Sequence, residues 1–311
     1  MSEELRNVSS NPHIRTKLST SGIMFCVVLA LMPTTIYGCI HFGWHALLLV
    51  LVCIFGAVGT EFIYDICMKK EMTIFDGSAL VTGILLALNL PPQLPAWEAL
   101  LGSVFAILVV KLLFGGLGQN FMNPALGGRC FLLLSFAGSM TNFTVDGVSS
   151  ATPLALIKQG ESVDVLAMIT GNTAGTIGET SMICILIGAC FLLIMGIIDL
   201  RIPGTYIVTF LLFEILFGGH GFEPVYLSAQ LAGGGLMLGA FFMATDYVTR
   251  PVTKKGQYVF GIFLGVMTAI FRIYGKSAEG VSYAIVLGNL LVPLIEKVTM
   301  PKAFGKGGER L

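Results

Sequence analysis

Long apolar runs alternate with short polar segments along the whole chain, and this pattern predicts membrane helices. A bilayer core of about 30 Å takes roughly 20 residues of helix. Two of the runs, 77–90 and 204–217, are short, so we expect these helices to be tilted, broken or buried against other helices. The pattern predicts an all-α integral membrane protein in which residues 1–311 form a single polytopic domain. The predicted spans are ten in number: 22–40, 46–68, 77–90, 97–114, 122–137, 179–199, 204–217, 228–243, 257–272 and 279–296.

The composition agrees with a chain that lies mostly in a lipid bilayer. Of its 311 residues, 55% are apolar and 12% are charged, about half the roughly 25% that is usual in soluble domains. The 38 glycines suit closely packed membrane helices, because small residues let helix backbones approach one another. The 18 basic and 18 acidic residues cancel, which removes the electrostatic case for nucleic-acid binding.

The basic residues are distributed unevenly between alternate loops, and this predicts the orientation. Cytoplasmic loops of bacterial inner-membrane proteins are enriched in Lys and Arg. With the N-terminus inside, the outside segments hold Lys158, Arg272 and Lys276, and Arg129 lies near the start of the fifth run. The inside segments hold fourteen basic residues: Arg6, Arg15, Lys17, Lys69, Lys70, Lys111, Arg201, Arg250, Lys254, Lys255, Lys297, Lys302, Lys306 and Arg310.

This asymmetry predicts a multi-pass protein of the bacterial inner membrane with both termini in the cytoplasm. Residues 1–21 form the N-terminal tail, in which no cleavable signal peptide is evident, and residues 297–311 form the C-terminal tail. Residues 138–178, rich in Gly, Ser and Thr, form a long outer loop. Long irregular loops are usually functional or disordered.

The span count also predicts an internal repeat. Ten spans divide into five plus five, and an odd number of spans per half makes a two-fold repeat an inverted one, as in many transporters. The short third and eighth spans hold matching places in the two halves. Asp76 borders the third span and Asp246 borders the eighth.

A short motif in the predicted outer loop carries the chemistry. Residues 146–154 read DGVSSATPL and resemble the D-x-x-[ST]-x-A-T signature, at which an ApbE-type flavin transferase joins FMN to a threonine through a phosphoester. The acceptor would be Thr152, and Asp146, Ser149, Ser150 and Ala151 belong to the signature. Small neighbours leave room for the transferase and the flavin, and Pro153 restricts Thr152 to extended geometry. The structural alternative is a Ser/Thr turn capping a helix that starts at Pro153.

Other segments resemble the D subunit of Rnf complexes, over nearly the whole chain. The resemblance extends to the B subunit of the sodium-translocating NADH:quinone reductase, whose long N-terminal extension is lacking here. The segments are 11–15 (NPHIR), 76–83 (DGSALVTG) leading to 89–92 (NLPP), 111–125 (KLLFGGLGQNFMNPA), and 241–246 (FFMATD) followed by 249–251 (TRP).

The resemblance implies a subunit of a ferredoxin:NAD oxidoreductase that couples electron flow to Na⁺ or H⁺ movement, with covalent FMN as one carrier. It implies other membrane and peripheral subunits as partners, beside the flavin transferase and the lipid bilayer. It also implies a helix arrangement like that of urea and ammonium channels. We expect the isolated chain not to be self-sufficient, because it has no Rossmann fingerprint for NAD and no cysteine cluster for iron–sulfur chemistry.

A second, non-covalent flavin is a further expectation, because an outer flavin lies about 30 Å of hydrocarbon from electron donors in the cytoplasm. The related reductase subunit holds riboflavin as a family property. The candidate wall here is Asn120, Asn123 and Arg129 with the glycines at 115, 116 and 118, closed by Thr245 and Asp246. The structural alternative is a tight connection between packed helices, which glycine-rich turns often make.

The remaining polar residues give weaker indications of function. Glu61 and Glu214 are candidates for an ion path, although each lies near a span end, where a carboxylate can reach the interface. Asp76 is as suited to capping a helix. The seven cysteines form no C-x-x-C pair and no histidines have metal-ligand spacing, so we expect no metal site.

Two other functions stay open at this stage. A solute channel or secondary transporter fits ten spans, broken helices and an inverted repeat, and fold alone does not decide function. A purely structural membrane scaffold is the third. The flavinylation signature separates the redox subunit from both, whereas nothing in the sequence distinguishes Na⁺ from H⁺.

Overall fold

The computed structural model describes residues 19–145, 148–149, 152–159, 163–179, 181–275 and 280–301. Most of the two predicted tails therefore lies outside the described residues. The longer elements are α1 (Thr20–Phe42), α2 (Trp44–Cys67), α3 (Ser78–Leu88), α4 (Ala96–Phe105), α5 (Pro124–Ser135), α9 (Met182–Ile194), α10 (Arg201–Phe217), α11 (Pro224–Ala232), α13 (Lys254–Tyr274) and α14 (Val281–Thr299).

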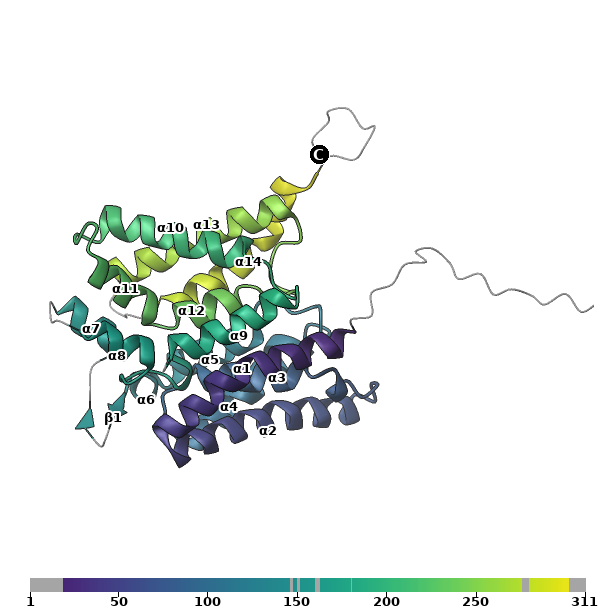
Figure 1. The fold of residues 1–311 in the computed structure, drawn as a ribbon. Helices are drawn as coiled ribbons and strands as arrows, with labels where there is room; N and C mark the ends of the chain where they lie inside the picture. The colour runs from purple at the N-terminus through teal and green to yellow at the C-terminus, as the bar shows by residue number, and fades with distance from the viewer. Residues whose placement is uncertain are drawn as a thin grey trace, which may run out of the picture.

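Short elements join or extend these helices (Figure 1). Two π-helical segments, η2 (Ala106–Leu112) and η4 (Gly239–Met243), continue α4 and the short α12 (Leu236–Leu238). The remainder are η1 (Ile74–Asp76), α6 (Ala137–Met140), β1 (Thr144–Val145), β2 (Val148–Ser149), α7 (Pro153–Lys158), α8 (Val165–Thr170) and η3 (Ile177–Glu179).

Each of the ten apolar runs coincides with a helix or a helix pair, which confirms a helical, multi-pass membrane protein. By length and apolarity, four described helices can cross a bilayer, α1, α2, α13 and α14, and α11 with Leu236–Met243 adds a fifth span bent by 60°. The helices α3, α5 and α9 are apolar but short. The count of ten spans therefore stays a prediction.

The two halves of the chain, 20–135 and 182–299, pack in parallel ways. In the first half α2 packs against α3 and α4, and in the second half α10 packs against α13. The halves meet where α1 contacts α9 and where α5 contacts α14. Figure 1 shows the first half, in purple and blue, as one layer and the second half, in green and yellow, as the other. The five-plus-five repeat and its inversion both stay predictions.

Glycines at the helix contacts explain the close packing. A Cβ atom on Gly265 of α13 would lie 2.8 Å from the backbone oxygen of Tyr206 in α10. One on Gly83 of α3 would lie 2.9 Å from the backbone oxygen of Cys53 in α2. Small residues at such points let membrane helices associate by close van der Waals contact.

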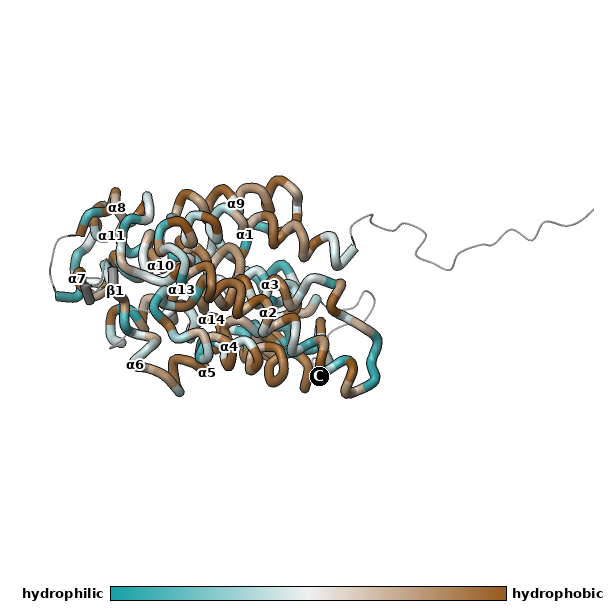
Figure 2. The backbone as a smooth tube through the Cα atoms, turned by 90° about the horizontal axis from the view of Figure 1, so that it is seen from below, coloured by the Kyte–Doolittle hydropathy of each residue, from teal (hydrophilic) through white to brown (hydrophobic). Residues whose placement is uncertain are grey.

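The segment predicted as a long outer loop is more ordered than expected. Within 138–178, β1 and β2 pair antiparallel, with Thr144 opposite Ser149, and α7 and α8 follow. Both helices pack on α11, which supplies the apolar contact that helices of six residues need for stability. Figure 2 shows hydrophilic backbone, in teal, at this end of the molecule and apolar backbone, in brown, along the long helices.

Candidate functional sites

Thr152 stands directly before α7, at the position of a helix N-cap. Its backbone is extended, with φ of −63° and ψ of 150°, and Pro153 follows at the first helical position. The alternative prediction of a helix start at Pro153 is thus confirmed. The Thr152 side chain, however, makes no capping hydrogen bond. The hydroxyl is therefore not used in the role that this alternative assigned to it.

Thr152 lines a small pocket, which we call the Thr152 pocket. Its walls come from α7, from α8 and the segment that follows it, and from the glycines after α11. Of the rest of the motif, Ser149 lies in β2, while Asp146, Ser150 and Ala151 lie outside the described residues. The lining residues are Thr152, Pro153, Leu154, Met168, Thr173, Ala174, Glu179, Ala232, Gly233 and Gly234.

Two charged groups lie near this pocket. The Lys158 amine at the other end of α7 donates to the backbone oxygen of Gly275 at 2.8 Å. Partial burial, followed by repulsion from the Arg272 guanidinium, lowers the pKa of Lys158. Glu179 accepts from the Thr176 amide at 3.4 Å. Of these two groups, only the Glu179 carboxylate is among the residues that line the Thr152 pocket.

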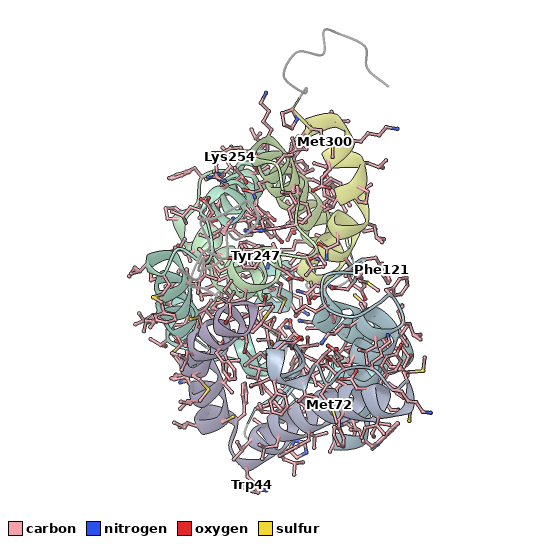
Figure 3. All side chains as sticks on the ribbon, turned by 90° about the vertical axis from the view of Figure 1, so that its right-hand side faces the viewer. Trp44, Met72, Phe121, Tyr247, Lys254 and Met300 are labelled. Carbon is pink, nitrogen blue, oxygen red and sulfur yellow. The ribbon has the colours of Figure 1, made fainter. Side chains whose placement is uncertain are left out.

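A larger cavity lies where the two halves of the chain meet, and we call it the interhalf cavity. Its enclosed volume is about 90 Å³, smaller than the roughly 300–1,000 Å³ usual for small-molecule sites. Most of its walls are apolar side chains of α1, α3, α9 and η4. In Figure 3, Tyr247, one of its lining residues, lies at the centre of the view between the halves. The polar lining residues are Ser78, Thr82, Lys111, Asn120, Asn123, Thr245 and Asp246.

The cavity contains several of the residues predicted for a second flavin. Asn120 and Asn123 come from the first half, and Thr245 and Asp246 come from the second half. The Asn123 side chain caps α5 by accepting from the amides of Ala125 and Leu126, and its amide nitrogen lies 3.4 Å from the Met243 backbone oxygen. The glycines at 115, 116 and 118 are not among the lining residues, although Leu117 between them is.

Arg129 was predicted to line the cavity, but it is not among the lining residues. It is 3% exposed and donates to the Asn89 side-chain oxygen at 2.6 Å. Asn89 in turn donates to the Leu85 backbone oxygen. Arg129 joins α5 to the end of α3, and this partner stands 40 positions away in the chain, so sequence spacing gave no sign of it.

Lys111 is a charged residue of the cavity wall that the sequence analysis did not assign to the site. It was placed among cytoplasmic loop residues, but it is 2% exposed and lies within the π-helical segment η2. Its amine donates to Glu61 and to Ser78, each at 2.7 Å. A charge can be buried there because an acidic partner and a hydroxyl replace its water. The lysine in an otherwise apolar run was the only sequence signal.

The two acidic candidates are buried rather than at the interface. Glu61 and Glu214 are both 0% exposed. Glu61 accepts from Lys111 and, at 2.7 Å, from Thr73, whereas Glu214 accepts from the Tyr226 hydroxyl at 2.9 Å. These partners explain why neither carboxylate reaches toward the headgroups. Glu61 lies on α2 and Glu214 lies on α10.

The other predictions about polar residues hold in part. Asp76 accepts from the backbone amide of Ser78 at 2.7 Å, but the N-cap of α3 is Gly77, so Asp76 precedes the capping position that was predicted for it. The His45 ring bonds the Pro92 backbone oxygen. Arg272, predicted in an outside segment, is 2% exposed and is held by backbone oxygens.

Comparison with known proteins covers nearly the whole length of the chain. At 47% identity, over 98% of this chain and 97% of the relative, it matches the D subunit of the Na⁺-translocating ferredoxin:NAD⁺ oxidoreductase complex of Acetobacterium woodii. At 40% identity, over 96% of both chains, it matches the D subunit of the proton-translocating ferredoxin:NAD⁺ oxidoreductase complex of Clostridium ljungdahlii. The D subunit of the ion-translocating oxidoreductase complex of Methanosarcina acetivorans is 36% identical over 96% of both chains.

The family model described as the NQR2, RnfD, RnfE family matches residues 7–305. This match takes in the Thr152 motif and every helix of both halves. The chain therefore belongs to the NQR2, RnfD, RnfE family.

Proposed function

We propose that the chain is a membrane subunit of an ion-translocating ferredoxin:NAD oxidoreductase complex and carries FMN in phosphoester linkage to Thr152. The observation that carries the proposal is the position of Thr152. The last residue of the flavinylation signature lies directly before a helix without capping it, and it lines a pocket. The linked flavin would supply an electron carrier that is fixed to one place in the complex.

The residues around Thr152 fit an attached group. Thr152 is only partly buried, so a separate transferase can reach it. The threonine lines the Thr152 pocket together with Thr173 and Ala174, whose small side chains crowd the hydroxyl little. Mass spectrometry of the peptide 141–158, after expression with a flavin transferase, should show the mass of one FMN residue on Thr152.

We also propose that the interhalf cavity holds a second flavin, such as riboflavin, without a covalent bond. Its apolar walls and its amide and hydroxyl groups suit a flat heteroaromatic ring with polar edges. Lys111 and Asn123 would donate hydrogen bonds, while Asp246 and Thr245 could accept them. Both halves of the chain contribute lining residues to this cavity. The proposal rests on the chemical groups of those residues.

Acid extracts of purified Thr152→Ala protein should accordingly contain about one free flavin per chain. Asn123→Ser keeps a capping side chain for α5 but removes the amide from the cavity wall, so the free flavin should be lost. Asn172→Ser, in the segment after α8, is the matched control and should retain it. A flavin-free Thr152→Ala protein that still assembles into the complex contradicts a second site.

The orientation belongs to the same proposal. We place both termini in the cytoplasm and α7 and α8 outside, with the chain in a bacterial inner membrane beside the other subunits. In a background without native cysteines, Leu166→Cys on α8 should react with an impermeant thiol reagent in intact cells, and Lys70→Cys only after lysis. Both side chains are exposed. The opposite labelling pattern means that the orientation is inverted.

The coupling ion is Na⁺ or H⁺. The relatives at 47% and 40% identity bear names with different ions, so similarity does not choose between them. The alternative of a solute channel has no observation in its favour, because the relatives that match over nearly their full length are named as subunits of oxidoreductase complexes.

A further inference from the structure

The bent helix pair breaks at three successive glycines. Helix α11 ends at Ala232, and Leu236 begins the next helix after a bend of 60°. Gly233 has an extended backbone with φ of −97°, whereas Gly234 and Gly235 have positive φ of 65° and 64°. The positive angles explain glycine at the last two positions. They do not explain glycine at 233.

The packing of helix α7 explains why residue 233 is a glycine. Leu154, in the first turn of α7, is 5% exposed. A Cβ atom on Gly233 would lie 3.0 Å from the Leu154 Cγ atom and 2.9 Å from the Met168 Cε atom. One on Gly234 would lie 2.5 Å from the Leu154 Cδ1 atom. Leu154 thus packs into space that exists only because residues 233 and 234 have no side chains.

Helix α7 is fastened at its other end as well. Lys158, its last residue, donates to the backbone oxygen of Gly275, which ends α13. A helix of six residues is not stable by itself. Its position is therefore set by these two attachments, one apolar and one polar.

Arg272 maintains the shape of the break. The last backbone oxygens of a helix have no partner within it, and inside an apolar layer they need one. Arg272, on α13, donates to the Gly233 oxygen at 2.9 Å and to the Gly234 oxygen at 3.3 Å. It also bonds the backbone and side-chain oxygens of Gln230. The guanidinium fork takes the place of the missing helical amides.

We propose that Gly233 and Gly234 form a docking seat for α7, held in shape by Arg272, and that this seat positions the flavin attached to Thr152. The inference rests on the proposed function for the identity of the attached group, while the seat itself is a property of the fold. Thr152 stands two positions before Leu154, so the phosphoester is fixed wherever Leu154 is seated. Gly233, Gly234, Leu154 and Arg272 act as positioning residues, through the place that they give to α7.

The seat can be tested without any flavin. In full-length protein without native cysteines, Leu154→Cys should react slowly with a thiol reagent and Leu166→Cys, whose parent side chain is 69% exposed, should react fast. Gly233→Val introduces a bulky side chain into an extended backbone that valine adopts readily. Because the seat is overpacked, labelling of Leu154→Cys should rise roughly tenfold or more, with Leu166→Cys unchanged.

Gly204→Val in α10 is the matched control, since a Cβ atom there meets nothing within 4 Å, and it should leave both rates unchanged. Where Gly233→Val fails to fold, Gly233→Ala applies the same clash more mildly. If the cysteine at position 154 reacts as slowly in the folded Gly233 variant as it does with Gly233 present, the proposed docking seat is wrong.

The positioning role is tested on flavinylated protein. Leu154→Ala removes the seated side chain without overpacking, so the polarisation of flavin emission should fall and the flavin midpoint potential should shift, at full flavin content. Gly204→Ala should move neither. Raised cysteine labelling with unchanged polarisation and potential overturns the positioning role. A wild-type protein without flavin on Thr152 refutes the proposed function instead, and the labelling experiment then decides the seat by itself.

Discussion

Replacement of Thr152 by alanine should remove all covalent flavin from the protein. The phosphoester needs a hydroxyl oxygen, and alanine has none. The Thr152 side chain makes no capping bond, so its loss should leave α7 in place and the protein should fold and assemble. Fluorescence of the denatured chain under blue light in a gel is the measurement. The assembled complex should lose electron transfer from ferredoxin to NAD, if the linked flavin is an obligatory carrier.

Two controls make this experiment specific. Thr141→Ala removes a nearby hydroxyl, which bonds the Ala137 backbone oxygen at 2.8 Å, and it should leave fluorescence unchanged. Thr152→Ser retains an oxygen at the acceptor position and reports whether the transferase needs the threonine methyl group. Fluorescence that persists in Thr152→Ala, or disappears in Thr141→Ala, contradicts the assignment of the acceptor.

The features that could be predicted from the sequence are those that depend on residues close together along the chain. The ten apolar runs predicted the helices because membrane helices satisfy their backbone hydrogen bonds internally. The short run at 77–90 became α3, which is buried on nearly every residue, as its length suggested. The helix start at Pro153 followed from proline chemistry. In each case a window of about twenty residues or fewer contains the cause.

The features that escaped prediction depend on contacts between distant segments. Lys111 finds Glu61 at a separation of 50 positions, and Arg272 finds the oxygen of Gly233 at a separation of 39. Charge counting placed both cations in loops, because a basic residue near a predicted span end reads as an interface anchor. The distribution of charge still predicts orientation after these two are set aside, since most basic residues remain in the predicted inside segments.

The two predicted flavin sites differ in the same way. The Thr152 site is defined by a contiguous motif that a transferase reads as a local sequence. The interhalf cavity depends on η4 and the 245–248 turn of one half meeting α3 and α5 of the other. The sequence supplied Asn120, Asn123, Thr245 and Asp246 but misplaced Arg129, because the direction in which a side chain faces is set by helix packing.

Replacement of Lys111 by methionine should cost about 3–5 kcal/mol in the free energy of unfolding, the usual cost of breaking a buried ion pair from one side. The Lys111 amine and the Glu61 carboxylate lie 2.7 Å apart with side-chain exposures of 3% and 1%. Among the described residues, removing the amine leaves the carboxylate with the Thr73 hydroxyl alone for compensation, and its second oxygen has no hydrogen-bond partner there. Thermal or denaturant unfolding of the purified protein in mild detergent measures the loss.

The double variant Lys111→Met with Glu61→Gln separates the charge effect from packing. Both charges are then absent, and a buried pair replaced by neutral side chains of similar size is often close to neutral in stability, so most of the loss should be recovered. Asp199→Asn breaks the exposed pair with Arg201, which is 2.8 Å long with exposures of 27% and 47%, and should cost at most about 1 kcal/mol. A double variant no more stable than Lys111→Met shows that the lysine stabilises the protein by packing of its chain, and not by its charge. The proposed second flavin site predicts in addition that free flavin falls in Lys111→Met and in the double variant alike, because Lys111 lines the interhalf cavity and methionine cannot donate a hydrogen bond.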